Sequence, residues 1–215
     1  MSSLYETIRR IVQEELCSLR TAELGVVKEQ HPHAADSDTD NFACTVALRN
    51  SGLLLAHVPV ATARMGLAAI PAVGDLVLVH FLGGNLNAPV ITGSLYNDED
   101  RPPVNEDGQL VLHLPLGAED GDAVKLVLRS GDDRSIELAL GSGLSLTLHD
   151  DDPVVKLEVD GGKATLQIDR DGAVTVTSQA DVSVETQGNL AFKGSEVTVE
   201  AQATLTLKGA TVNIN

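Results

Sequence analysis

The chain has 215 residues, of which 43% are hydrophobic and only 2% aromatic, and its 31 acidic and 15 basic residues give a formal net charge of −16. This apolar content excludes a disordered chain, and the length suffices for one large domain or two modest ones. The negative charge argues against nucleic-acid binding, which needs a basic surface, and against an anionic membrane surface.

Residues 1–20 are predicted to form an amphipathic helix. Leu4, Ile8 and either Ile11 or Val12 recur at helical spacing, and the stretch lacks the uninterrupted apolar core of a signal peptide. Such a helix either packs on its own domain or docks on a partner protein. Both alternatives stay open at this point.

Residues 21–97 are predicted to form a small barrel of the OB type. Five β-rich runs are separated by turn residues, which suits a five-stranded closed barrel. The runs are AELGVVKEQ, FACTVALRN, LLLAHVPV, DLVLVHFLG and APVITGSLY. The charged, proline-containing stretch of residues 98–108 then marks a connector between two domains.

Residues 109–215 are predicted to consist of strands only. In the last part, pairs of apolar residues recur about every eight residues, which is an internal repeat. These predicted inward pairs are Val174/Val176, Val182/Val184, Leu190/Phe192, Val197/Val199, Leu205/Leu207 and Val212/Ile214. Looser alternation precedes them from Leu110 onward, with inward candidates such as Leu110/Leu112/Leu114 and Leu126/Leu128, and is interrupted by Gly-Asp turns.

Two inward side chains per strand form a stripe, and a stripe alone cannot make a core. We therefore expect each strand to pair with a strand of another chain, since an unpaired edge invites association. Three chains wound about one axis satisfy this need. The predicted fold class is mainly β, with an N-terminal helix, an OB barrel and a trimeric, triangular β-helix whose core holds Val174, Val176, Val182, Val184, Leu190, Phe192, Val197, Val199, Leu205 and Leu207.

The run IPAVGDLVLVHFLGGNLNAPVITGSLYNDEDRPP, Ile70 to Pro103, resembles the baseplate assembly protein V family of contractile phage tails. It is also similar to the corresponding part of the VgrG spike of type VI secretion. The upstream runs LYETIRRIVQEEL and AELGVVKE resemble the start of that family. The likeness covers essentially the whole chain.

The resemblance implies a homotrimeric central spike of a contractile, phage-tail-like injection particle. Its wide N-terminal end would sit on a hub protein under the tail tube, and its narrow end would point at the envelope to be pierced. The particle would assemble in a bacterial or archaeal cytoplasm and be released or membrane-attached afterwards. A PAAR-type tip protein would dock on Thr211, Val212, Asn213, Ile214 and Asn215.

No metal, cofactor or catalytic residue is predicted. His31 and His33 of the HPH motif are expected in a solvated loop, and the last 60 residues hold no histidine for a metal-bound tip. The stretch DSDTDN, Asp36 to Asn41, fails the calcium-loop pattern at its sixth and twelfth positions. Cys17 and Cys44 form no CxxC motif and are expected to be two free thiols rather than one disulfide.

An enzyme and the other classes of protein fit the sequence less well than a central spike does. The chain has no G-x-S-x-G or H-E-x-x-H motif, and the connector is too short for the lysozyme domain that some relatives carry. The alternatives are a trimeric β-helical tail fibre or adhesin and an OB-fold binding module. A fibre normally ends in a receptor-binding head, and a binding module would need exposed aromatics and a basic groove.

Overall fold

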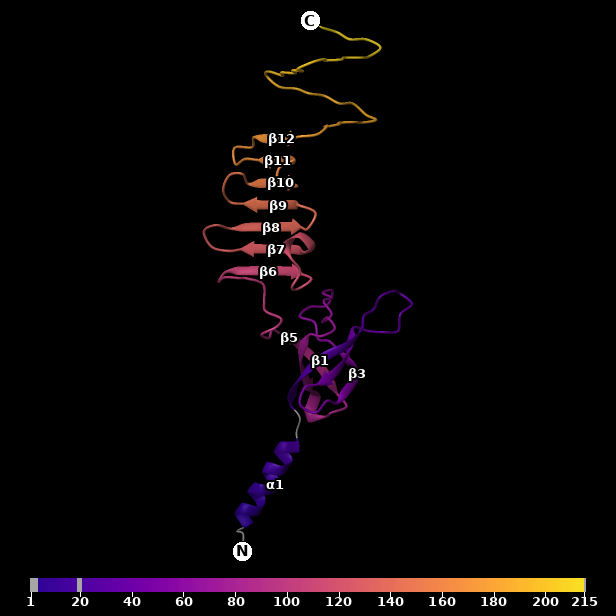
Figure 1. The fold of residues 1–215 in the computed structure, drawn as a ribbon, viewed down its shortest axis with the longest axis vertical. Coiled ribbons are helices and arrows are strands. Elements are labelled where there is room, and N and C mark those ends of the chain that lie inside the picture. The colour runs from indigo at the N-terminus through magenta and orange to yellow at the C-terminus, as the bar shows by residue number, and fades with distance from the viewer. Residues whose placement is uncertain (1–3, 19–20, 215) are drawn as a thin grey trace.

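The computed structural model describes residues 4–18 and 21–214 of the chain. In chain order it has one helix, a five-stranded sheet, a seven-stranded sheet and a C-terminal segment, stacked along one long axis (Figure 1). Both sheets are antiparallel. The expectation of a mainly β protein with one N-terminal helix is therefore confirmed.

Helix α1 (Leu4–Ser18) extends away from the barrel (Figure 1). Its apolar side chains Leu4, Ile8, Ile11 and Val12 are 49–77% exposed, so they do not pack on the rest of this chain. The observed helix lies within the predicted range of 1–20, whose remaining residues fall outside the described part of the chain. No helix that the structure describes is long and apolar enough to cross a membrane.

The five-stranded sheet closes into the barrel predicted from the sequence. Its strands are β1 (Ala22–His31), β2 (Ala43–Leu48), β3 (Leu54–Pro59), β4 (Leu76–Phe81) and β5 (Pro89–Leu95), in the order β3-β2-β1-β4-β5. A parallel bridge between Val60, the residue directly after β3, and Ile91 of β5 closes the ring. This pairing is that of an OB barrel. A short 3₁₀ turn (Leu82–Gly84) follows β4.

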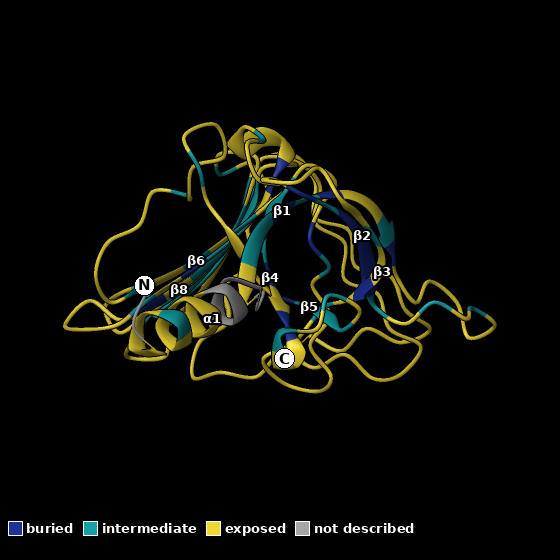
Figure 2. Ribbon diagram, turned by 90° about the horizontal axis from the view of Figure 1, so that it is seen from below, coloured by how far each residue is buried: buried dark blue, intermediate teal, exposed yellow. Residues whose placement is uncertain are grey.

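Alternate strand residues point into the barrel and form its core. Closure of the sheet into a barrel leaves few exposed strand edges. Figure 2 shows the buried residues concentrated in these strands. The core residues are Val27, Cys44, Val46, Leu48, Val58, Val77, Val79, Phe81 and Ile91. Cys44 is a free thiol, and the side chain of Cys17, the second expected thiol, lies outside the described part of the structure. Burial of Cys44, together with the nearby Asp75 charge, raises the pKa of its thiol.

Gly25 in β1 leaves room for the side chain of Val46 on the neighbouring strand β2. A Cβ at this position would lie 2.3 Å from Val46 Cγ1, and Val46 is fully buried and cannot move aside. We expect Gly25→Ala to destabilise the protein by about 1–3 kcal/mol through overpacking. Gly93→Ala in β5 is the matched control, because its Cβ would meet nothing within 4 Å. Equal melting temperatures for the two variants in thermal unfolding would contradict this packing.

The seven-stranded sheet is a meander in which each strand pairs with the next one of the same chain. Its strands are β6 (Gln109–Leu114), β7 (Val124–Arg129), β8 (Ser135–Leu140), β9 (Leu144–His149), β10 (Val155–Val159), β11 (Ala164–Ile168) and β12 (Val174–Ser178). A 3₁₀ turn (Asp120–Asp122) precedes β7. The prediction that every strand after residue 109 pairs with another chain is therefore wrong for β6–β12.

The physical reason lies in the conformation of the turns between these strands. Asp160 and Gly161 have φ values of 47° and 67°, the left-handed pair that closes a tight hairpin. Gly131, Gly143 and Gly172 also have positive φ in the turns of neighbouring hairpins. These turns reverse the chain, so the next strand returns beside the last one.

Residues 179–214 form no strand in the single chain, although six strands were predicted from Val174 onward. Only the first of them, β12, is formed. The segment swings from side to side beyond β12 in wide turns (Figure 1). Its successive runs do not lie next to one another, and a strand without a neighbour has no hydrogen-bonding partner.

Candidate functional site: an apolar assembly face

One face of the β6–β12 sheet is apolar along its whole length. The strand register places Leu112 opposite Leu126, Leu126 opposite Leu138, and so on across the sheet. The resulting central column is Leu112, Leu126, Leu138, Leu146, Leu157, Leu166 and Val176. We call this side of the sheet the apolar face.

A column on each side of the central one completes the apolar face. One contains Leu110, Leu128, Ile136, Leu148, Val155, Ile168 and Val174, and the other contains Leu114, Val124, Leu140, Leu144, Val159, Ala164 and Ser178. Because side chains alternate along a strand, the intervening residues lie on the opposite face. That face is mostly polar and carries the ion pair between Arg129 and Glu137, with 3.1 Å between nitrogen and oxygen.

No element among residues 4–18 and 21–214 covers the apolar face. Leu110 is 59% exposed, Leu114 53% and Val176 65%. A sheet with one apolar and one polar face normally buries the apolar one. A contiguous uncovered patch of this kind marks an interaction surface.

The residues predicted to form the trimer core are all solvent-exposed in the single chain. Val174 and Val176 lie on the apolar face of β12. The other eight lie in the strandless segment with 53–74% exposure, and the single chain does not bring them together; they are Val182, Val184, Leu190, Phe192, Val197, Val199, Leu205 and Leu207.

The predicted tip-docking residues lie at the far end of the same segment. Thr211 and Asn213 are exposed, as are Val212 at 50% and Ile214 at 85%. Asn215 falls outside the described residues. Two apolar side chains thus alternate with polar ones in an uncovered stretch of chain.

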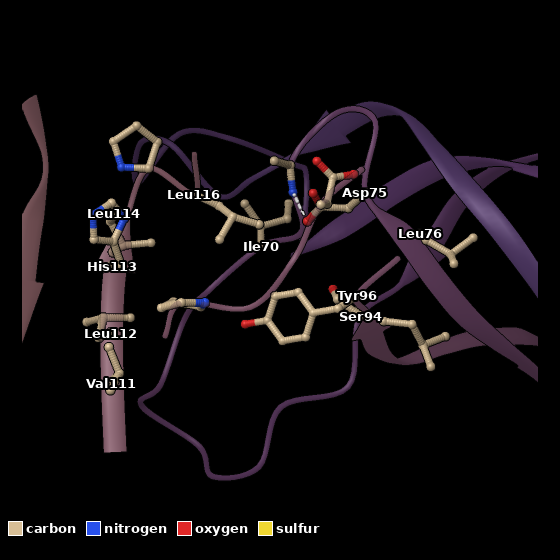
Figure 3. Close-up of a pocket in the computed structure, with 15 residues that line it drawn as sticks. Ile70, Asp75, Leu76, Ser94, Tyr96, Val111, Leu112, His113, Leu114 and Leu116 are labelled. Atoms are coloured by element: carbon tan, nitrogen blue, oxygen red, sulfur yellow. Dashed lines mark hydrogen bonds between the residues drawn. The ribbon is translucent and has the colours of Figure 1, made fainter. Parts of the chain in front are cut away.

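A cleft of about 400 Å³ lies between the barrel and the first strand of the sheet (Figure 3). Ile70, Leu76 and Tyr96 line it on the barrel side, and residues 111–116 line it on the β6 side. The cleft includes Leu112 and Leu114 of the apolar face, so it continues that face toward the barrel. Its lining is mostly apolar and also includes Asp75, Ser94, Asp100 and His113.

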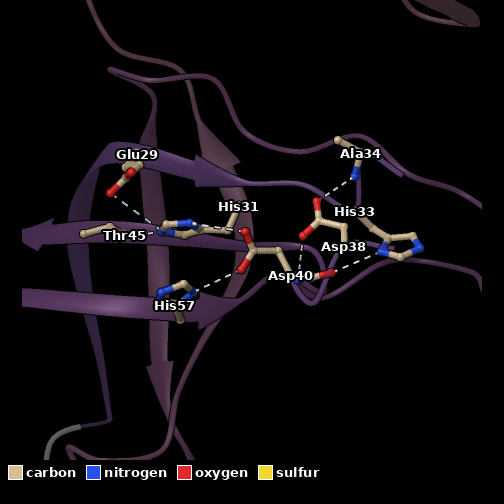
Figure 4. Close-up of polar contacts among 8 residues, drawn as sticks. All are labelled: Glu29, His31, His33, Ala34, Asp38, Asp40, Thr45 and His57. Atoms are coloured by element: carbon tan, nitrogen blue, oxygen red, sulfur yellow. Dashed lines mark hydrogen bonds and ion pairs between the residues drawn. The ribbon is translucent and has the colours of Figure 1, made fainter. Parts of the chain in front are cut away.

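A second, polar cluster lies on the barrel at the base of the β1–β2 loop (Figure 4). His31 is the last residue of β1 and only 9% exposed, so the prediction of a solvated loop is wrong for it. Only His33 lies in the loop and is exposed, and its Nδ1 lies 3.2 Å from the backbone oxygen of Asp40. Sequence reasoning missed this cluster because Asp40 and His57 approach His31 only in the folded barrel.

Asp38 organises the loop that carries Asp40. One carboxylate oxygen accepts a hydrogen bond from the Asp40 backbone N–H at 2.9 Å, and the other accepts one from Ala34 N–H at 3.2 Å. These backbone donors, that of Asp40 foremost, lower the pKa of Asp38. The DSDTDN stretch is thus a polar turn held by hydrogen bonds from backbone N–H groups to the Asp38 carboxylate.

The closed five-stranded barrel with its parallel closing bridge defines an OB fold, and an uncovered apolar sheet follows it. Residues 22–96 match the family described as the type VI secretion system/phage-baseplate injector OB domain. The match confirms the resemblance for residues 70–96, which lie within the matched stretch. No curated protein matches the chain.

Proposed function

We propose that the chain is the subunit of a homotrimeric central spike in a contractile, phage-tail-like injection particle. The observation that carries the proposal is the uncovered apolar face of β6–β12, which directly follows a baseplate-injector OB domain. Such a face requires a partner of similar size and chemistry. A second and a third copy of the same sheet provide one.

In the proposed trimer, three β6–β12 sheets form the three sides of a prism and turn their apolar faces inward. The polar faces, with Arg129 and Glu137, remain in water. Residues 179–214 then find their missing strand partners in the other two chains. Their eight-residue repeat gives one short strand per side and layer, which is a triangular β-helix.

The proposed mechanism is mechanical rather than catalytic. Sheath contraction would drive the tail tube, and the tube would drive the spike into an envelope. An axial load on one layer would be shared by backbone ladders within and between three chains. The dry interior opposes separation of the chains, because opening it exposes apolar surface to water.

The two ends of the spike would serve different partners. The exposed apolar side chains of α1 suit a contact with the hub protein or tail tube at the wide end. At the narrow end, Thr211–Asn215 would hold a PAAR-type tip protein. The particle would assemble in the cytoplasm and be released or stay membrane-attached.

Particle assembly tests the spike function. Removing the chain from cells that produce the particle should abolish assembled contractile particles in negative-stain electron microscopy, and the wild-type chain should restore them. Thr175→Asp, on the polar face, should restore them as well, whereas Val176→Asp should not. Normal particles in the absence of the chain would refute the role of a central spike.

Tip docking is tested by deleting residues 211–215. The truncated chain should keep the oligomeric mass of the wild type, because the prism above residue 211 is unchanged. It should lose the co-purification of a PAAR-type protein encoded beside it. Retention of the tip protein by the truncated chain would place the docking surface elsewhere.

A further inference from the structure

Three side chains from separate segments converge on the barrel surface. They are His31 at the end of β1, Asp40 in the β1–β2 loop and His57 in β3 (Figure 4). One potential ligand atom of each lies within 4.8 Å of the other two. Nδ1 of His31 is 4.0 Å from one Asp40 carboxylate oxygen, and Nδ1 of His57 is 3.7 Å from the other.

Two β-bulges at the same level of the barrel bring these side chains together. The β1–β2 register shifts between Val27 and Glu29, and the β2–β3 register shifts between Cys44 and Val46. Each shift adds a residue opposite the neighbouring strand, which re-aims the side chains nearby. His57 lies in the second shift with a φ of 49°, an unusual conformation that often accompanies a functional site.

The buried histidine is already oriented for a ligand on its Nδ1 atom. Its Nε2 lies 2.8 Å from Thr45 Oγ1 and 3.9 Å from a Glu29 carboxylate oxygen. With the proton on Nε2, Thr45 Oγ1 accepts its hydrogen bond, the Glu29 carboxylate lies nearby, and the lone pair of Nδ1 faces Asp40. Metal-binding histidines are commonly held in this way by a carboxylate or another acceptor behind the ring.

The second imidazole lies alongside the first. The rings of His31 and His57 stack with their centroids 4.0 Å apart and an angle of 26° between their planes. Both Nδ1 atoms therefore face the same carboxylate. The two nitrogen–oxygen distances of 3.7 and 4.0 Å are too long for hydrogen bonds, so Asp40 satisfies neither ring directly.

We propose that His31, Asp40 and His57 bind one divalent transition metal ion of the Zn²⁺ class. Two imidazoles and one carboxylate are a ligand set that such ions take, with water completing the coordination. Metal–ligand bonds of about 2.1 Å in a tetrahedron put neighbouring ligand atoms about 3.4 Å apart. The two histidine–carboxylate separations of 4.0 and 3.7 Å approach this value, and a rotation of the His57 ring out of the stack would aim both nitrogen lone pairs at one ion.

The bound ion would fix the base of the β1–β2 loop, which projects from the side of the barrel (Figure 1). It would tie the loop through Asp40 to β1 and β3 at once. This role concerns the barrel of each chain and does not depend on the proposed trimer. His57 is 62% exposed and Asp40 37%, so an ion can enter from solvent.

Zn²⁺ titration of the full-length protein by calorimetry tests the site, with Co²⁺ absorption as a second readout of tetrahedral coordination. We expect about one Zn²⁺ per chain. His57→Asn and Asp40→Asn should each weaken binding at least about tenfold. Both should fold, because asparagine tolerates positive φ at position 57 and matches aspartate in shape at position 40. His33→Asn, an exposed neighbour outside the cluster, is the matched control.

The outcomes separate this proposal from the spike function. Tight binding at one site, lost in both cluster variants and kept in His33→Asn, supports the metal site. The proposal is overturned by a wild type without stoichiometric binding, by cluster variants that bind like the wild type, or by equal loss in His33→Asn. None of these variants should change the oligomeric mass, so that measurement reports on the spike function alone.

Discussion

Val176→Asp should dissociate or strongly destabilise the native assembly. Val176 is 65% exposed in the single chain, so an aspartate there would be harmless to an isolated subunit. In the proposed prism it places three carboxylates against one another in an apolar interior. An uncompensated buried charge costs about 3–5 kcal/mol per site, and mutual repulsion adds to this cost.

Thr175→Asp is the matched control for this substitution. Thr175 is the adjacent residue of β12, is also exposed, and pairs with Gln167 on the opposite face of the sheet. Its change should shift stability by less than about 0.5 kcal/mol. Thermal unfolding and light scattering of the two variants measure the difference. Equal, mild effects would show that the apolar face is not buried in the native protein.

The amides of residues 179–214 should exchange hydrogen slowly in the native protein. The segment forms no strand in the single chain, where its backbone groups would exchange as fast as those of a loop. In the trimer these groups bond to the other two chains and become protected. Hydrogen–deuterium exchange followed by mass spectrometry measures the segment peptide by peptide.

The exchange pattern has an internal reference. Peptides from β9–β11 are hydrogen-bonded on both sides within one chain and should be protected in any assembly state. Protection of residues 179–214 close to that of β9–β11 is the expected result. Fast exchange over residues 179–214 beside protected β9–β11 would contradict interchain strands.

The barrel was predictable from the sequence because its signals are local. Each run of alternating apolar residues became one strand, and Gly74 and Gly83 mark turns with positive φ. The pairing of β6–β12 was not predictable from the alternation of apolar residues alone. Short alternating strands separated by turns fit both a strand from each of three chains and a hairpin within one chain. The left-handed turn at Asp160 and Gly161 decides for the hairpin.

The inward and outward positions were easier to predict than the partners of each strand. Alternation assigned Leu112, Leu126 and Val176 to one face, and the register confirms that they share it. The cluster of His31, Asp40 and His57 was not predictable, because its residues are far apart in the sequence. His31 and His57 are 26 positions apart, and two register shifts, which no sequence period records, bring them together.

The mass of the native protein in solution tests the central claim most directly. Each chain has a mass of 22.6 kDa. Sedimentation equilibrium or light scattering should give three times this value at every concentration at which the protein is folded, because the apolar faces of β6–β12 have no other cover. A stable, folded species with the mass of one chain would contradict the account.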